Sequence, residues 1–212
     1  KGIFGKVESK IIDTDEPGLK DIELNIEEKP TGEIMAGAGY GSDGSTISVG
    51  IKENNFNGKG IILESDLRLT EDSIKGSLNY KHPNFMYSDR ALSTSLVISD
   101  TDKLNDFGYK SSLNSISLGT SYEQFENTFF SPSISISNES LETTSDASDA
   151  YKKQEGSYFD TSFSYGLSFD KRNSSYQPTS GYYSNWYQKL PIVSENQTIV
   201  NGYIITGYKE LV

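Results

Sequence analysis

The sequence predicts an all-β protein that spans a membrane as an antiparallel barrel. Apolar and polar residues alternate with a period of two in segment after segment, and no segment has a convincing 3.6-residue period. Many of these segments are near ten residues, about the length that a tilted strand needs to cross a bilayer. Only 34% of the 212 residues are hydrophobic, and 14 of those are Tyr. A barrel accounts for this low fraction, because one strand face meets lipid and the other meets a wet lumen.

The clearest strand covers residues 158–170. Its odd positions from Phe159 to Phe169 are mostly aromatic or aliphatic, and the even positions between them are Asp, Ser and Gly. The same alternation predicts strands near 33–40, 47–52, 61–69, 74–81, 92–99, 116–122 and 130–136, with two less clear ones near 181–190 and 197–209. We therefore expect about ten strands.

The connections are expected to alternate in length. Polar stretches at 100–109 and 138–156 follow odd-numbered barrel strands, whereas shorter turns at 54–59, 82–89 and 123–127 follow even-numbered ones. Short turns on one side and longer loops on the other are typical of outer-membrane barrels.

The first thirty residues differ from the rest. Residues 7–12 and 22–26 alternate as two short strands around a polar turn at 13–18, and the outer face of the second strand is charged. This pattern predicts the end of a small soluble domain over 1–29, with the membrane part over 30–212. Pro30, Thr31 and Gly32 would form the hinge between them.

Composition excludes several classes of function. Thirty acidic against nineteen basic residues give a net charge of -11, which disfavours nucleic-acid binding. The chain has no Cys and a single histidine, His82, so we expect no metal site, no cofactor and no covalent catalysis. The acidic stretch 139–155 could hold calcium, but it lacks the spacing of an EF-hand and is expected to be a solvated loop. Glu64 and Asp66 alternate with Arg68, which fits a polar lumen better than acid–base chemistry.

Three motifs carry a resemblance to a known family. Residues 27–32 (EEKPTG) followed by 36–41 (AGAGYG) resemble the junction between the last POTRA domain and the first barrel strand of the BamA family of outer-membrane protein assembly factors. Residues 54–60 (NNFNGKG) resemble the turn after that family's second strand. Residues 165–173 (YGLSFDKRN) and 178–181 (PTSG) resemble its eighth strand, the periplasmic turn and the start of strand nine.

The resemblance implies periplasmic POTRA domains followed by a sixteen-stranded outer-membrane barrel. Residues 1–29 would then be the C-terminal strands of the last α+β POTRA domain, and 30–212 about the first ten barrel strands, so the chain is interpreted as an internal fragment. The implied activity is insertion of β-barrel proteins at a lateral gate beside strand one, without enzymatic chemistry. Implied partners are unfolded outer-membrane proteins, accessory lipoproteins and membrane lipid. The gate residues would be Gly32, Glu33, Ile34, Met35, Ala36, Gly37, Ala38, Gly39, Tyr40 and Gly41.

Some alternatives stay open. The glycines of 37–41 are not a nucleotide loop, because a strand and not a helix follows them. They either weaken a strand that must open, or give room for barrel curvature. Five residues after the strand at 158–170 are expected mainly to hold the shape of a turn, and the alternative is a functional polar cluster in the lumen. These residues are Asp170, Arg172, Asn173, Pro178 and Gly181. For the whole protein, the alternatives are a TamA-like factor, a two-partner secretion pore, a passive porin or adhesin, and a soluble β-rich domain.

Overall fold

A computed structural model describes residues 3–16, 18–41, 44–195 and 197–210. A two-stranded sheet, β1 (Phe4–Asp13) and β2 (Lys20–Glu28), precedes a sheet of ten strands. The ten are β3 (Gly32–Gly41), β4 (Gly44–Phe56), β5 (Ile61–Thr70), β6 (Ser73–His82), β7 (Ala91–Lys103), β8 (Tyr109–Phe125), β9 (Thr128–Thr143), β10 (Gly156–Asp170), β11 (Gly181–Val193) and β12 (Val200–Tyr208). Short helical turns are η1 (Phe85–Tyr87), α1 (Leu104–Phe107) and α2 (Asp149–Lys152).

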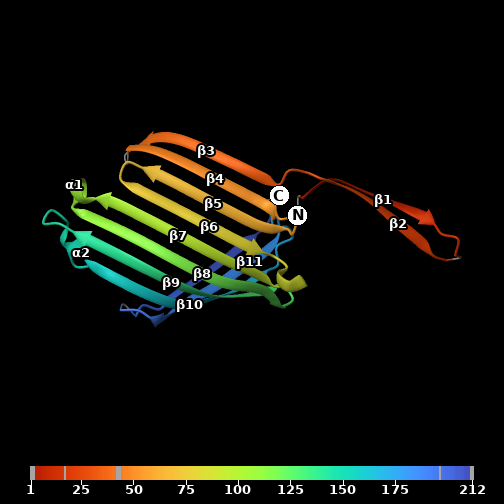
Figure 1. Cartoon of the computed structure of the whole chain (residues 1–212). Coiled ribbons are helices and arrows are strands. Elements are labelled where there is room, and N and C mark those ends of the chain that lie inside the picture. Colours follow the sequence, from red (N-terminus) through yellow and green to blue (C-terminus); the bar gives the residue numbers. More distant parts are fainter. Residues whose placement is uncertain (1–2, 17, 42–43, 196, 211–212) are drawn as a thin grey trace.

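The large sheet is an up-and-down meander. Each strand pairs antiparallel with its neighbours in sequence, and β3 and β12 form the two edges (Figure 1). The predicted set of about ten antiparallel strands is therefore confirmed. The two strands before it, predicted as short ones at 7–12 and 22–26, have 10 and 9 residues. Consecutive strands that are joined by short connections can pair antiparallel without a crossover. A run of alternating segments in sequence order is therefore enough to predict this meander.

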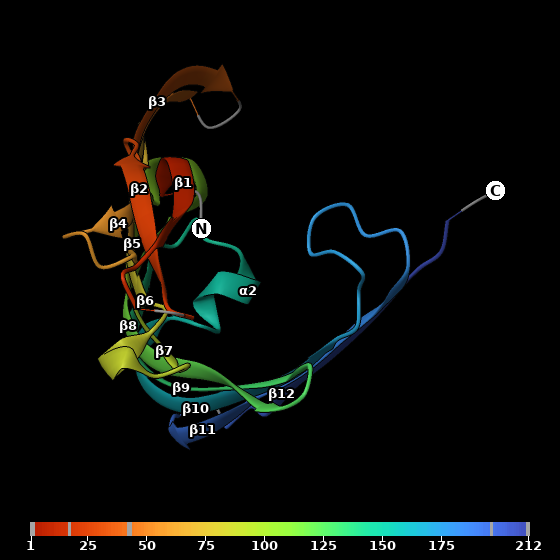
Figure 2. The same cartoon turned by 90° about the vertical axis from the view of Figure 1, so that its right-hand side faces the viewer.

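The register separates the two faces of the sheet. Ala36, Val49 and Leu67 lie side by side on one face, whereas Met35 and Gly50 lie side by side on the other. The sheet is strongly curved, and α2 lies on its concave side (Figure 2). Because the polar face lines a cavity together with residues of α2, the polar face is the concave one and the apolar face is convex.

The sheet has almost no hydrophobic core of the kind that soluble proteins have. Among the described residues, the buried apolar side chains are those of Ile61, Leu141 and Ala147. Large apolar side chains on the convex face are instead exposed, with Ile34 at 79% and Ile47 at 56%. Within the described ranges no helix is long and apolar enough to cross a membrane. An apolar surface of this extent requires a nonpolar partner to cover it, as the lipid-facing band of a barrel has.

The connections match the expected length contrast only in part. At the end of the sheet opposite the β1–β2 hairpin, the longest connection spans 144–155, but β5 and β6 are joined by residues 71–72 alone. At the hairpin end, 83–90 and 171–180 are longer than the turn at 126–127. Half of the polar stretch 100–109 and the start of 138–156 belong to strands. Ser and Thr in these stretches continue the period of two, so their polarity does not mark a loop.

The β1–β2 hairpin projects beyond the end of the large sheet at which β3 begins (Figure 1). Val7 opposes Ile26 and Ile11 opposes Ile22, so one face of the hairpin is apolar, and all four side chains are exposed. The opposite face is charged. An isolated two-stranded ribbon is at best marginally stable. The turn predicted over 13–18 is only partly visible, because Pro17 lies outside the described residues.

Candidate functional site: the edge strand and its junction

The strand β3, which contains all ten predicted gate residues, is the edge of the ten-stranded sheet. It pairs with β4 from Gly32 opposite Glu53 to Gly41 opposite Gly44. Its other edge has no partner strand in the described part of the chain. Every residue of β3 is exposed, and Tyr40 is 86% exposed. An edge of this kind presents backbone N–H and C=O groups that can pair with another strand.

Gly39 and Gly41 of β3 are not required by packing. A Cβ placed on Gly39 or Gly41 would meet no atom within 4 Å, and neither residue has a positive φ. On Gly37 a Cβ would lie 3.0 Å from the Ser48 hydroxyl oxygen, which is the end of a short, rotatable side chain. By contrast, a Cβ on Gly50 of β4 would lie 2.9 Å from a carboxylate oxygen of Asp66. A lack of space beside the backbone therefore explains neither Gly39 nor Gly41.

The predicted hinge is held by hydrogen bonds on its barrel side. The Thr31 hydroxyl donates to a carboxylate oxygen of Glu53, and the Thr31 carbonyl accepts from the Asn54 backbone N–H at 3.3 Å and from its side-chain amide at 3.2 Å. The same Glu53 oxygen accepts the Asn55 N–H at 2.7 Å. Thr31 is thus attached to the end of β4, and any freedom of the junction lies on the other side of Thr31, toward Pro30.

Residues 57–60 complete this junction. Asn55 accepts the Gly60 N–H at 2.7 Å through its side-chain oxygen, and Asn57, Gly58 and Gly60 all have positive φ, which Gly and Asn tolerate best. The sequence indicates a turn at 54–60, and the structure has one there. The sequence does not indicate its contact with Thr31, because nothing in the order of residues 31 and 53–55 signals that they meet.

The predicted turn set lies in the connection 171–180 between β10 and β11. Arg172 donates to both carboxylate oxygens of Asp170, at 2.8 and 2.6 Å, and the bond to Asp170 raises the pKa of the Arg172 guanidinium. Asn173 accepts the N–H groups of Thr179 and Ser180 at 3.0 and 3.1 Å. The structure brings these groups together inside one loop.

Gly181 closes the same loop. Its φ is +96°, and a Cβ there would lie 2.0 Å from the carbonyl oxygen of Lys171. Pro178 lies within the same connection between β10 and β11. The polar set thus supports the shape of the chain at this end of the sheet, and does not gather at β3.

Charged residues of opposite sign lie on neighbouring strands of the concave face. Lys52 of β4 is the direct cross-strand partner of Glu33 in β3 and of Glu64 in β5. Among the described residues, no three His, Cys, Asp or Glu side chains are placed to hold a metal ion.

Comparison with known proteins gives the family and the fold. Residues 55–206 match the model of the Omp85 superfamily domain. The chain is similar to a solved structure described as BamA from Haemophilus ducreyi lacking POTRA domains 1–3, with a TM-score of 0.72 and 24% sequence identity, over 97% of this chain and 43% of that one. The chain thus spans less than half the length of that relative, and the predicted outer-membrane barrel fold is confirmed. No curated protein gave a significant match. The chain belongs to the Omp85 superfamily.

Proposed function

We propose that this chain is part of an outer-membrane insertase, in which the outer edge of β3 templates the strands of β-barrel proteins as they fold. Membership in a superfamily of outer-membrane barrels that insert or transport proteins supports this function. The observation that carries it is the position of β3 at the end of the ten-stranded sheet, together with Gly39 and Gly41, where an added Cβ would meet no atom within 4 Å.

Strand templating needs an edge that can open and pair again. A glycine in a strand adds backbone entropy to the open state and contributes no side-chain contacts, so it weakens pairing by roughly 0.5–1 kcal/mol relative to alanine. Gly37, Gly39 and Gly41 lie in the half of β3 farthest from Thr31. We propose that this half releases first, while the Thr31–Glu53 contact retains the other end.

Residues 3–29 are proposed to be the C-terminal strands of a POTRA domain, with Pro30–Gly32 linking it to the barrel. The support is the amphipathic hairpin β1–β2, whose exposed Val7, Ile11 and Ile22 need an apolar partner. An α+β domain supplies such a partner by packing a helix on the sheet. In this proposal the hairpin end of the barrel faces the periplasm, where accessory lipoproteins bind, and the convex face contacts membrane lipid.

The proposal is tested by locking the seam in the complete protein. One cysteine replaces Ala36 in β3, and another is placed opposite it in the strand that closes the barrel. Residues 1–212 contain no native Cys that could form a competing disulfide. The assay measures assembly of a barrel substrate into vesicles under oxidising and reducing conditions. We expect oxidation to stop assembly and reduction to restore it.

The matched control is a disulfide between two interior strands of the sheet, away from the seam. Ser95 of β7 and Ser117 of β8 are direct cross-strand partners, so Ser95→Cys with Ser117→Cys should crosslink without touching the seam and leave assembly unchanged. Normal assembly by the seam-locked protein would overturn the lateral-gate function. Such a result would favour a secretion pore, which passes its cargo through the lumen.

A further inference from the structure

A polar cavity of about 420 Å³ lies on the concave side of the sheet, beside α2. Its walls come from β5 to β9 and carry three cations, Arg68, Lys75 and Lys103, against one carboxylate, Glu139. The rest of the lining consists of several Ser and Thr side chains together with Tyr109, Leu141, Tyr151 and Gln154. A cavity with a net positive lining is unexpected in a chain whose net charge is -11.

The two central cations face each other. Arg68 of β5 and Lys75 of β6 are direct cross-strand partners, and like charges in this position destabilise a sheet. Lys52, on the same face, has Glu33 and Glu64 as its two cross-strand neighbours. The other neighbours of Arg68 and Lys75 are Ser48 and Ser99.

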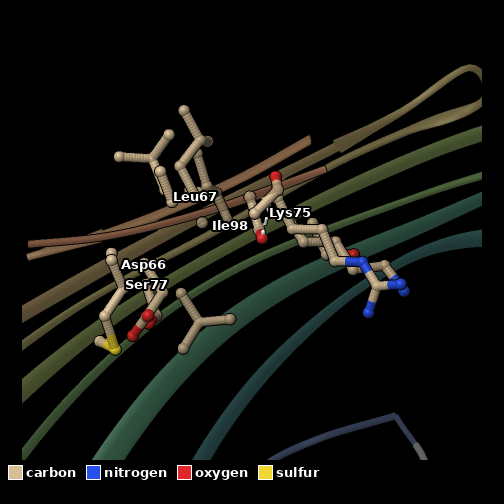
Figure 3. A pocket seen from close by; sticks show the side chains of 15 residues that line it. Asp66, Leu67, Lys75, Ser77 and Ile98 are labelled. Atoms are coloured by element: carbon tan, nitrogen blue, oxygen red, sulfur yellow. Dashed lines mark hydrogen bonds between the residues drawn. The ribbon is translucent and has the colours of Figure 1, made fainter. Parts of the chain in front are cut away.

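Neither cation forms an ion pair within the described part of the chain. Among the described residues, Arg68 and Lys75 form no ion pair and no hydrogen bond. Asp66, the carboxylate nearest to Arg68 in sequence, lies on the same face of the sheet, and its Oδ1 atom is 2.9 Å from the position that a Cβ on Gly50 of β4 would take. Figure 3 shows an adjacent hollow that Arg68 and Lys75 also line, with Leu67 and Asp66 leaving the sheet on opposite faces. The two positive charges therefore lie on the lumen side without an ion pair among the described residues, although Asp66 and Glu139 lie on the same side.

The side of the cavity that α2 forms is ordered by specific contacts. Tyr151 stacks on Tyr109 with ring centroids 4.3 Å apart. The N–H of Thr144 donates to the Gly108 carbonyl at 2.8 Å, and Ala147 is 5% exposed. Gly108 has φ +71°, and a Cβ there would lie 2.5 Å from the Ala147 nitrogen. The loop 144–155 is thus packed against the β7–β8 connection, which gives the cavity a defined shape.

We propose that this cavity is a binding site for a phosphate-class dianion, clamped between Arg68 and Lys75. Paired cations suit a group with several acceptor oxygens, and charge-assisted hydrogen bonds are about twice as strong as neutral ones. The surrounding hydroxyl groups would bind the remaining oxygens or a polyhydroxy carrier of the phosphate. The site is independent of β3 and of strand templating.

Calorimetric titration of the complete protein in detergent, at constant ionic strength, tests the site with inorganic phosphate, glycerol 3-phosphate and glycerol. We expect the two phosphates to bind and glycerol not to bind. Equal affinity for both phosphates would identify the free ion as sufficient, whereas tighter binding of glycerol 3-phosphate would identify a carried phosphate. Arg68→Gln with Lys75→Gln should weaken binding by about tenfold or more.

Lys52→Gln is the matched control, because it removes one positive charge from the same face at a position flanked by two glutamates. It should leave phosphate affinity unchanged. If the double variant does not fold, as judged by its heat-dependent migration in gels, Arg68→Gln and Lys75→Gln are titrated singly. No phosphate binding by the native protein, or equal loss in Lys52→Gln, would overturn the site.

Discussion

Replacing Gly39 and Gly41 of β3 by alanine should strengthen the edge strand and slow substrate assembly. A Cβ added at either position would have no atom within 4 Å, and neither residue has positive φ, so the substitution introduces no clash and no strain. Both residues lie in regular β pairing, opposite Thr46 and Gly44. The effect of the methyl groups is therefore expected to be mainly on backbone entropy in the open state.

The magnitude follows from two such positions. Each Gly→Ala change at a compatible site stabilises by about 0.4–1 kcal/mol, so the pair should stabilise β3 by about 1–2 kcal/mol. That free energy reduces the population of the open edge by a factor of roughly 5–30. If opening of β3 precedes substrate pairing, the rate of assembly should fall by up to the same factor.

Gly166→Ala is the control. Gly166 lies in the interior strand β10, and its nearest non-neighbouring atom would be 3.8 Å from a new Cβ, so the change is sterically mild there too. The assays are the urea midpoint of unfolding and the rate of substrate assembly in vesicles. An unchanged rate in the Gly39→Ala, Gly41→Ala protein, or an equal slowing in Gly166→Ala, would refute the role of a weak edge.

Three further changes probe the rest of the structure. Gly181→Ala should lower thermal stability by about 2 kcal/mol or more, because the new Cβ meets a backbone carbonyl oxygen at 2.0 Å and φ is +96°; an unchanged melting temperature would contradict it. The Ser45 N–H donates to the Glu71 carboxylate and lowers its pKa below 4.5. The bond therefore stabilises the folded protein at pH values above the unfolded-state pKa of Glu71, and this contribution is lost as the pH falls through the folded-state pKa. Glu71→Gln should therefore lose less stability than the native protein between about pH 7 and pH 3 in urea unfolding; equal losses would argue against the bond. Thr31→Val removes the bond to Glu53 and should speed hydrogen exchange in the first residues of β3, whereas unchanged exchange would show that the backbone bonds alone hold the junction.

Much of the barrel fold could be predicted because its physical rule is local. A strand between lipid and a wet lumen must alternate, so segments such as 158–170 reveal both their structure and their faces. The strand limits were less predictable. β8 and β9 extend to Tyr109 and Thr143, since a Ser- and Thr-rich strand beyond the apolar band has no hydrophobic signal to mark where it ends.

The candidate site divides in the same way. The glycine-rich strand 32–41 and the turn at Asn173 were visible as short motifs with glycine, proline and asparagine, and the resemblance implied that the strand lies at a gate. The Thr31–Glu53 contact and the Arg68–Lys75 pair were not visible. Both join residues on different strands, and which residues face each other depends on the register of the whole sheet.

By itself, the sequence determined the class of fold, the number of strands, the face that each residue takes and the change of character near residue 30, because each of these follows from alternation and turn chemistry within a few residues. Only the tertiary structure decided that β3 has an unpaired edge in the described chain, that Gly39 and Gly41 have open space, and that two cations meet beside α2. Those facts arise from pairing between strands, and a one-residue shift of register would change every one of those partners.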